Sequence, residues 1–334
     1  IFLIRRERAM KSLRKIFISL VILASTLSVI LFFPQFGEAV YPEKPVKFIV
    51  PWAAGGDTDA IVRIMASYAE KILGKPLIIV NITGASGTVG AREAKNSPPD
   101  GYTIFSVHDY IHTTYYVGIS DINYWDFEPI VLVTSTPAIV ATHFKAKWNS
   151  MKELLEDAKK RPGQITFGAT LGSTSHFFPA LIEKEADIKW RYVSYEGTAP
   201  RMTALLGGHI DLGETNIPGG KELLRAGKIK LLAIATEKRS PELPDVPTLK
   251  ELGINIVYAV NRGVFALKGT PEDILVKLED TFSKTAKDPG FKKEMEKFGT
   301  DVLFLDRKGY TDFLKKNDAT NAEIANILGF KRKK

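Results

Sequence analysis

Short apolar runs alternate with longer amphipathic segments from Val46 to the end of the chain. This alternation predicts an α/β protein with largely parallel sheets, because buried parallel strands are joined by helices. The predicted strands span residues 46–50, 76–80, 103–107, 130–133, 138–141, 165–168, 190–193, 210–213, 230–236, 263–266 and 302–305. That is more strands than one ordinary sheet holds, so we expect two sheets in two domains.

Two helices have recognisable ends. Between residues 59 and 73 the apolar positions recur at helical spacing, with Asp57 or Thr58 as the predicted N-cap and Gly74 at the stop. A second helix is predicted to open at Thr270 with a first-turn proline and two acidic residues, and to run to about Lys287.

The first 39 residues are typical of an export signal rather than of a domain. Six basic residues come first, an apolar run spans residues 16–33, and small residues end at Ala39. We expect a signal peptide that starts at Met10 and is cleaved after about Ala39, which places the protein in the periplasm or elsewhere outside the cytoplasm. The alternative is a retained N-terminal membrane anchor, since 18 apolar residues are just long enough to span a bilayer. The small residues at the cleavage position favour export.

Composition removes several classes of function. The 334 residues include no cysteine, which excludes disulfides, thiolate metal sites and thiol nucleophiles. The net charge of +8 falls to +4 without residues 1–39, and four more positive charges lie at the end of the chain, in residues 331–334. No stripe of basic and aromatic residues runs through the body of the chain, so we expect no nucleic-acid partner. We also expect a monomer without a metal or a cofactor.

Four loops that join a strand end to a helix start carry the candidate chemistry. They span residues 51–58, 81–90, 169–176 and 195–200, and they are rich in Gly, Ser and Thr but poor in cations. Backbone N–H groups at helix starts and hydroxyl groups bind anions, so loops that converge on one cleft would suit a carboxylate. Any single loop of this composition is explained by turns and caps. The recurrence of such loops favours a binding cleft but does not identify its ligand.

Enzyme motifs fit poorly. A dinucleotide fingerprint would need glycine where Ser86 stands, and neither a phosphate-binding Gly-Lys-Ser/Thr sequence nor the hydrolase elbow occurs. His108 and His112 have the spacing of a helical metal pair, but residues 109–116 are rich in Thr and Tyr and do not favour a helix. We interpret both as partly buried histidines. His176 is expected to hold the third loop in shape by hydrogen bonding.

The order of several motifs resembles the tripartite tricarboxylate transporter substrate-binding proteins, also called the Bug family. The resemblance covers residues 41–330 and rests on Val50 to Asp59 with Arg63, Asn81 to Gly90, Pro99 to Thr103, Gly172 to His176, Tyr195 to Gly197, Gly207 to Asp211, and Lys238 to Gly253. It implies a two-domain, periplasmic-binding-protein-like fold, each domain a mostly parallel sheet flanked by helices, with the ligand cleft between the domains. The implied domains are residues 40–139 with 261–334, and residues 140–260. The chain would cross between them at residues 136–138 and 260–263.

The function implied is that of a receptor, not an enzyme. It would close over a small carboxylic acid, such as a di- or tricarboxylate, an amino acid or an aromatic acid, and deliver it to a membrane permease. An exported enzyme acting on a small organic acid and a membrane-tethered sensor domain stay open as alternatives. The ligand-binding residues carried over by motif or by position after a strand are Trp52, Ala53, Gly55, Asp57, Thr58, Thr83, Ala85, Ser86, His108, Thr170, Gly172, Ser173, Thr174, Ser175, Tyr195, Gly197, Thr198 and Asn216.

Some residues depart from the family pattern or support it indirectly. Asp59 and Arg63 lie one helical turn apart and are expected to form an ion pair that supports the first loop. Ala53 and Ala54 stand in place of prolines, and Asn261 in place of a tryptophan at the second crossing. Glu196 stands where the family has lysine, which would disfavour a highly charged tricarboxylate or favour an amino acid if the side chain faced the cleft rather than solvent.

Overall fold

The structure, a computed structural model, describes residues 10, 14, 19 and 41–330. The predicted signal peptide therefore lies almost entirely outside the described residues and stays a prediction. Within the described part of the chain, no helix is both long and apolar enough to cross a bilayer. The chain from Tyr41 onward forms one compact unit.

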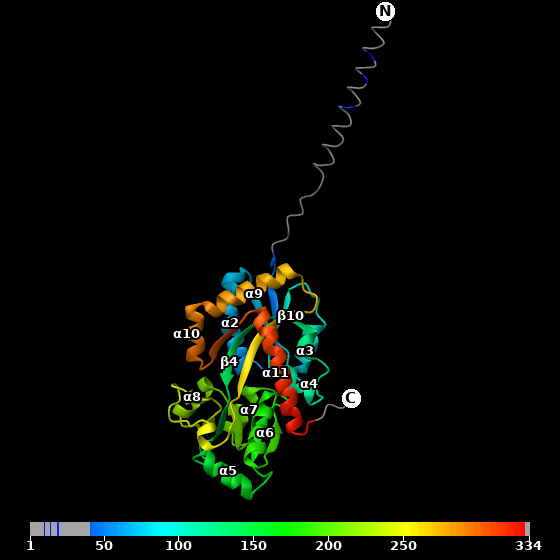
Figure 1. Cartoon of the computed structure of the whole chain (residues 1–334). Helices are drawn as coiled ribbons and strands as arrows, with labels where there is room; N and C mark the ends of the chain where they lie inside the picture. Colours follow the sequence, from blue (N-terminus) through cyan, green and yellow to red (C-terminus); the bar gives the residue numbers. More distant parts are fainter. Residues whose placement is uncertain (1–9, 11–13, 15–18, 20–40, 331–334) are drawn as a thin grey trace, which may run out of the picture. The chain divides into compact units, whose positions relative to one another are not determined.

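Two sheets organise this unit (Figure 1). The larger sheet has the strand order β11-β4-β10-β3-β1-β2, and the smaller has the order β7-β6-β8-β5-β9. The larger sheet consists of β1 (Val46–Val50), β2 (Leu77–Asn81), β3 (Thr103–His108), β4 (Phe127–Pro137), β10 (Ala259–Leu267) and β11 (Asp301–Leu305). The smaller consists of β5 (Ile139–His143), β6 (Thr166–Ala169), β7 (Arg191–Ser194), β8 (Leu212–Thr215) and β9 (Ile229–Ile234). All the predicted strands are present.

Both sheets are mixed rather than wholly parallel. Strand β1 pairs in parallel with β2 and β3, whereas β10 runs antiparallel to both of its neighbours. In the smaller sheet, β6 pairs in parallel with β7 and β8, and β5 is the antiparallel strand. The reversed strands β5 and β10 lie next to the points where the chain passes from one sheet to the other.

Helices surround each sheet. Around the larger sheet lie α2 (Asp57–Leu73), α3 (Thr88–Lys95), α4 (Tyr110–Tyr116), α9 (Glu272–Lys287), α10 (Pro289–Lys297) and α11 (Arg307–Ile327). Around the smaller sheet lie α5 (Met151–Lys160), α6 (Thr174–Ala186), α7 (Thr198–Leu206) and α8 (Ile217–Arg225). Short 3-10 helices span Ala85–Gly87, Tyr124–Asp126 and Lys250–Leu252.

The helices follow the predictions with three corrections, two at N-caps and one for a helix that was not expected. Gly74 ends α2 in the left-handed conformation as expected, but the N-cap is Gly56, so Asp57 and Thr58 already belong to the first turn. Pro271 rather than Thr270 caps α9. The segment not expected to be helical forms α4, because its residues from Tyr110 to Thr114 are buried and tertiary packing outweighs their weak helix propensity.

Each sheet has its own hydrophobic core. Phe48, Phe105 and Phe282 are fully buried around the larger sheet, and Phe167 and Phe178 around the smaller. The chain leaves the larger sheet at Pro137, enters the smaller at Ile139 and returns at the start of β10. These features fit two domains, while the exact boundaries given above stay a prediction.

A glycine in β10 makes room for the C-terminal helix. A Cβ atom at Gly263 would lie 2.5 Å from the carbonyl oxygen of Val131 and would overlap the hydroxyl of Tyr310, which α11 contributes. The strand also has a register shift between Arg262 and Gly263. Such a bulge redirects the neighbouring side chain.

We predict that Gly263→Ala lowers the free energy of unfolding by about 2 kcal/mol or more, because backbone and a buried ring must both move. Urea denaturation of the chain from Tyr41 onward measures this change. Gly213→Ala is the matched control in the centre of β8, where a new Cβ would meet only ordinary contacts at 3.6 Å or more. Equal stability of the two variants would contradict the prediction.

Candidate functional site

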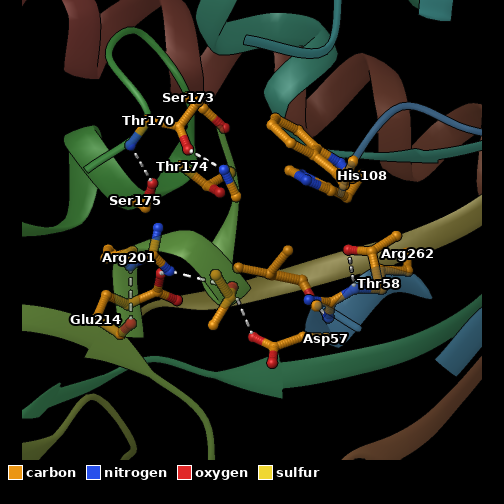
Figure 2. A pocket seen from close by; sticks show the side chains of 15 residues that line it. Asp57, Thr58, His108, Thr170, Ser173, Thr174, Ser175, Arg201, Glu214 and Arg262 are labelled. Carbon is orange, nitrogen blue, oxygen red and sulfur yellow. Dashed lines mark hydrogen bonds and ion pairs between the residues drawn. The ribbon is translucent and has the colours of Figure 1, made fainter. Parts of the chain in front are cut away.

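A small cavity lies between the two sheets, at the carboxyl ends of strands from both (Figure 2). Its volume is about 40 Å³, room for a few water molecules. It is lined by Trp52, Gly56, Asp57, Thr58, His108, Thr170, Ser173, Thr174, Ser175, Gly197, Thr198, Arg201, Glu214, Val260 and Arg262. Ligands of open α/β folds bind at this end of the strands.

The structure brings most of the predicted binding residues to this cavity. Those that line it are Trp52, Asp57, Thr58, His108, Thr170, Ser173, Thr174, Ser175, Gly197 and Thr198. Those that do not line it are Ala53, Gly55, Thr83, Ala85, Ser86, Gly172, Tyr195 and Asn216. Gly55 and Asn216 instead line a neighbouring hollow near α10. Asn216 caps α8, since its side chain accepts a hydrogen bond from Gly219 N–H at 3.0 Å.

Three helix N-termini meet at the cavity. The N-cap residues of α2, α6 and α7 are Gly56, Ser173 and Gly197, and none provides a side-chain cap. All three residues line the cavity. The first-turn N–H groups of a helix have no intrahelical acceptor and carry the positive end of the helix dipole. Uncapped N-termini favour an anion, most clearly at α6 and α7, whose first turns hold no acidic residue.

Arg201 is a buried cation that sequence reasoning missed. Its side chain is 2% exposed, and its guanidinium donates to the Glu214 carboxylate at 2.7 Å and to the Glu214 carbonyl oxygen at 3.1 Å. Gly168 in β6 leaves space for the arginine stem, since a Cβ there would lie 3.1 Å from Arg201 Cγ, whereas a Cβ at its partner Gly213 in β8 would lie at an ordinary 3.6 Å. Burial raises the pKa of Glu214, while Arg201 opposes that shift. The four loops are poor in cations, but the helix that follows the fourth loop brings this cation to the cavity.

Arg262 is the second buried cation. The β10 bulge places its guanidinium beside Thr58, whose hydroxyl accepts a hydrogen bond at 3.0 Å, and Thr136, which accepts one at 2.7 Å. Burial lowers the pKa of Arg262, and the nearby carboxylates of Asp57 and Glu214 oppose that shift. The two arginines and two carboxylates balance in charge, so the cavity is polar without excess charge of either sign.

His108 is a neutral hydrogen-bond donor in this cavity. Its ring stacks on Trp52 with centroids 5.0 Å apart, and its Nδ1 accepts a hydrogen bond from Tyr110 N–H at 3.1 Å. Burial and the charge of Arg262 hold the pKa of His108 well below its usual value. The proton therefore resides on Nε2. His112 is also buried, but it lies in α4 and contacts Asp318 at 3.0 Å, so the two histidines do not form a metal pair.

Residues that do not line the cavity hold the first loop, residues 51–58, in place. Asp59 and Arg63 form the predicted ion pair at 3.0 Å, and the same Asp59 oxygen accepts from Gly55 N–H at 2.9 Å. Asn81 links Asp59 to the carbonyl oxygen of Trp52. Although burial opposes ionisation, the hydrogen bonds from Arg63, Gly55 and Asn81 hold the pKa of Asp59 below its usual value.

The third loop is held by His176, as predicted. Its Nδ1 accepts a hydrogen bond from Gly172 N–H at 3.1 Å, which requires a neutral ring. Burial lowers the pKa of His176 to about 4. Phe330, after the end of α11, contacts this ring and stacks on Phe177 at 5.7 Å, so the C-terminal helix supports the same loop.

The second loop joins the two sheets instead of lining the cavity. Ser86 donates its hydroxyl hydrogen to the carbonyl oxygen of Leu171 at 2.6 Å. Thr83 and Ala85 are exposed. A second link between the sheets is the hydrogen bond from Thr198 to the Asp57 carboxylate at 3.0 Å. Loops from both sheets are therefore in direct contact.

In the described part of the chain, no group of three or more His, Asp or Glu side chains is arranged to hold a metal ion. The carboxylates near the cavity are occupied by other partners. Glu214 binds Arg201, and Asp57 accepts from Thr198.

We predict that stability depends on pH through His176. Above about pH 6.5 both folded and unfolded chains hold this histidine neutral, whereas at lower pH only the unfolded chain takes up a proton. The free energy of unfolding should therefore fall by up to roughly 3 kcal/mol from this group as the pH drops from about 6.5 to about 4. Urea denaturation at a series of pH values measures the slope.

His176→Gln keeps an acceptor for Gly172 N–H but removes the titrating ring, so the slope should become shallower without vanishing, because His108 still contributes. His209→Gln, at an exposed position, is the matched control and should retain the original slope. An unchanged slope in the His176 variant would show that another group governs the acid response.

We predict that Arg201→Met lowers the free energy of unfolding by about 3 to 5 kcal/mol, because it leaves Glu214 buried without its cation. The double variant Arg201→Met with Glu214→Met should recover most of that loss. Urea denaturation of the single and double variants measures the coupling. Lys284→Met, which breaks an exposed pair with Asp280, should cost well under about 1 kcal/mol.

Comparison with known proteins identifies the family. A model described as the tripartite tricarboxylate transporter family receptor matches residues 61–330. The structure of the periplasmic binding protein BugD is 32% identical, with a TM-score of 0.83, covering 87% of this chain and 99% of BugD. MatC from Rhodopseudomonas palustris, solved with bound malate, is 26% identical with a TM-score of 0.79, covering 85% of this chain and 99% of MatC. An R. palustris protein solved with adipate is 28% identical with a TM-score of 0.83, covering 87% of this chain and 99% of that protein.

These likenesses confirm the predicted fold class, with mixed sheets as in the structure above. The family consists of binding proteins rather than enzymes and implies a location outside the cytoplasm. The chain belongs to the tripartite tricarboxylate transporter receptor family, the Bug family of periplasmic solute-binding proteins.

Proposed function

We propose that this protein is an extracytoplasmic receptor that binds a small carboxylic acid between its two sheets and delivers it to a tripartite tricarboxylate-type permease. The observation that carries the proposal is the meeting of three uncapped helix N-termini with Arg201 and Arg262 at one cavity. A carboxylate is the small anion that such donors accept from two sides. Related proteins solved with malate and adipate support the same ligand class.

Both sheets supply donors to the proposed ligand. The larger sheet provides the α2 N-terminus and the Nε2–H of His108, and the smaller sheet provides the α6 and α7 N-termini and Arg201. The hydroxyls of Ser173 and Thr174 also line the cavity. A ligand held from both sides stabilises the conformation in which the sheets are close, which is the basis of closure by a hinge.

The described conformation corresponds to the closed form in this proposal. Ser86 and Thr198 already make hydrogen bonds between loops of the two sheets, which close the way to the cavity from that side. Ligand entry therefore requires the sheets to separate. The permease would distinguish the receptor forms by the surface that closure brings together.

Export is the remaining part of the proposal. Residues 1–39 would direct the chain across the membrane and be removed after about Ala39, leaving a monomeric receptor. The mass of the exported protein tests this step, since a retained segment would add the mass of those residues.

We predict that one carboxylic acid from a panel of mono-, di- and tricarboxylates, amino acids and aromatic acids raises the thermal unfolding midpoint by about 5 °C at a concentration 100 times its Kd. Sugars serve as controls, and the recovered acid should be chemically unchanged. No shift from any acid would reject the carboxylate ligand, and conversion of the acid would reject the receptor function.

Thr174→Val tests the site within the same assay. The variant replaces a cavity hydroxyl by a methyl group, so binding should weaken by about tenfold while the unliganded midpoint changes little. Thr134→Val is the matched control, because the Thr134 hydroxyl is buried without a hydrogen-bond partner in the described chain and does not line the cavity. Equal binding by both variants would place the ligand elsewhere.

A further inference from the structure

The protein provides its own carboxylate at the edge of the candidate site. Glu196 lies between β7 and α7, on the smaller sheet. Its two carboxylate oxygens accept from the backbone N–H of Ser86, on the larger sheet, at 3.3 and 3.5 Å. In the described part of the chain Glu196 is half-buried and forms no ion pair, so this backbone contact is its link to the opposite sheet. The side chain therefore reaches toward the opposite sheet, although the residue is partly exposed.

The Ser86 segment has the backbone shape of an anion-binding loop. Gly84, Ala85, Ser86 and Gly87 all have positive φ, at 121°, 46°, 57° and 88°. Ala85 and Ser86 are not glycine, so their backbone conformation is strained and must be held in place by the surrounding structure. Consecutive residues with unusual backbone angles can turn N–H groups toward one anion. In this chain the anion is the Glu196 carboxylate.

This contact lies at the rim of the cavity. Gly197, the residue after Glu196, lines the cavity, and so does Trp52. A Cβ atom at Gly87 would lie 3.2 Å from the Trp52 ring, and one at Gly197 would lie 3.9 Å from it. The Trp52 ring therefore lies close to Gly87, which follows Ser86, and to Gly197, which follows Glu196. An acid that extended from the cavity past Trp52 would meet Glu196.

Charge balance determines what such an acid can carry. Arg201 and Arg262 are already matched by Glu214 and Asp57 inside the cavity. A ligand carboxylate at the helix N-termini adds one negative charge, which the helix dipoles accept. A second ligand carboxylate beside Glu196 would face a like charge and would compete for the same N–H group. Like charges brought together at an interface are strongly unfavourable.

We propose that Glu196 occupies the position where the second carboxylate of a ligand would bind, so that the receptor selects acids with one carboxylate and a neutral or hydrogen-bond-donating far end. This inference rests on the proposed function and specifies its substrate class. An amide or ammonium group at the far end could donate to Glu196 directly.

Matched ligand pairs test the inference. A dicarboxylate and its monoamide, such as succinate with succinamate and adipate with adipamate, have nearly the same size and differ in one charge. Titration calorimetry on the chain from Tyr41 onward should show at least one monoamide binding about tenfold or more tighter than its dicarboxylate. Glu196→Gln should raise the affinity for that dicarboxylate by about tenfold and remove most of the preference.

Glu185→Gln is the matched control, since it removes the same charge from an exposed position in α6 of the same sheet. Its ligand preference should equal that of the unaltered protein. Glu196→Lys is a second variant, and it should favour the dicarboxylate over the monoamide. Circular dichroism and the unliganded midpoint establish that each variant is folded.

Two results would overturn the inference while leaving the proposed function intact. One is equal or tighter binding of the dicarboxylates by the unaltered protein. The other is a preference for the monoamide that neither folded Glu196 variant changes. If no member of any pair binds and the wider panel of acids also gives no shift, the proposed function fails, and this inference fails with it.

Discussion

Burial of two arginine side chains between the sheets is the constraint on which the site depends. An uncompensated charge in a protein interior is unfavourable by several kcal/mol, so each guanidinium needs oxygen partners fixed around it. Glu214 meets this need for Arg201, and the hydroxyls of Thr58 and Thr136 meet it for Arg262. Gly168 in β6 and the bulge in β10 are the backbone features that admit these side chains. The N-termini of α6 and α7 then add a positive potential, since neither helix has an acidic residue in its first turn.

Local sequence patterns were sufficient for most of the fold. The strands and the helices α2 and α9 have periodic apolar positions and clear end signals, and these depend on neighbours within a few residues. Segment α4 was missed because its burial, not its composition, makes it helical. The ion pair of Asp59 with Arg63 was predictable because its spacing is local to one helix.

The site was only partly predictable for the same reason. Loops with small and hydroxyl residues can be read from the sequence, and three of the four proved to line the cavity. Arg201 sits in the middle of an amphipathic helix, where arginine normally faces solvent, and Arg262 lies within a strand. No pattern in the neighbouring residues of the sequence indicates that both arginine side chains are buried. The close approach of Gly168 to the Arg201 stem emerges only once the packing of α7 on β6 is known.

The stacking of Phe330 on Phe177 bears on how the two sheets can separate. Helix α11 packs on β4 and α4 of the larger sheet, whereas Phe177 belongs to α6 of the smaller. The chain connections beside β4 and β10 form one fixed point between the sheets, and this aromatic contact forms another. Any opening must either pull Phe330 off α6 or rotate about a line through both points. The direction of opening is therefore restricted by a residue that touches neither the cavity nor the connecting strands, and the ease of opening depends on how firmly Phe330 is held against α6.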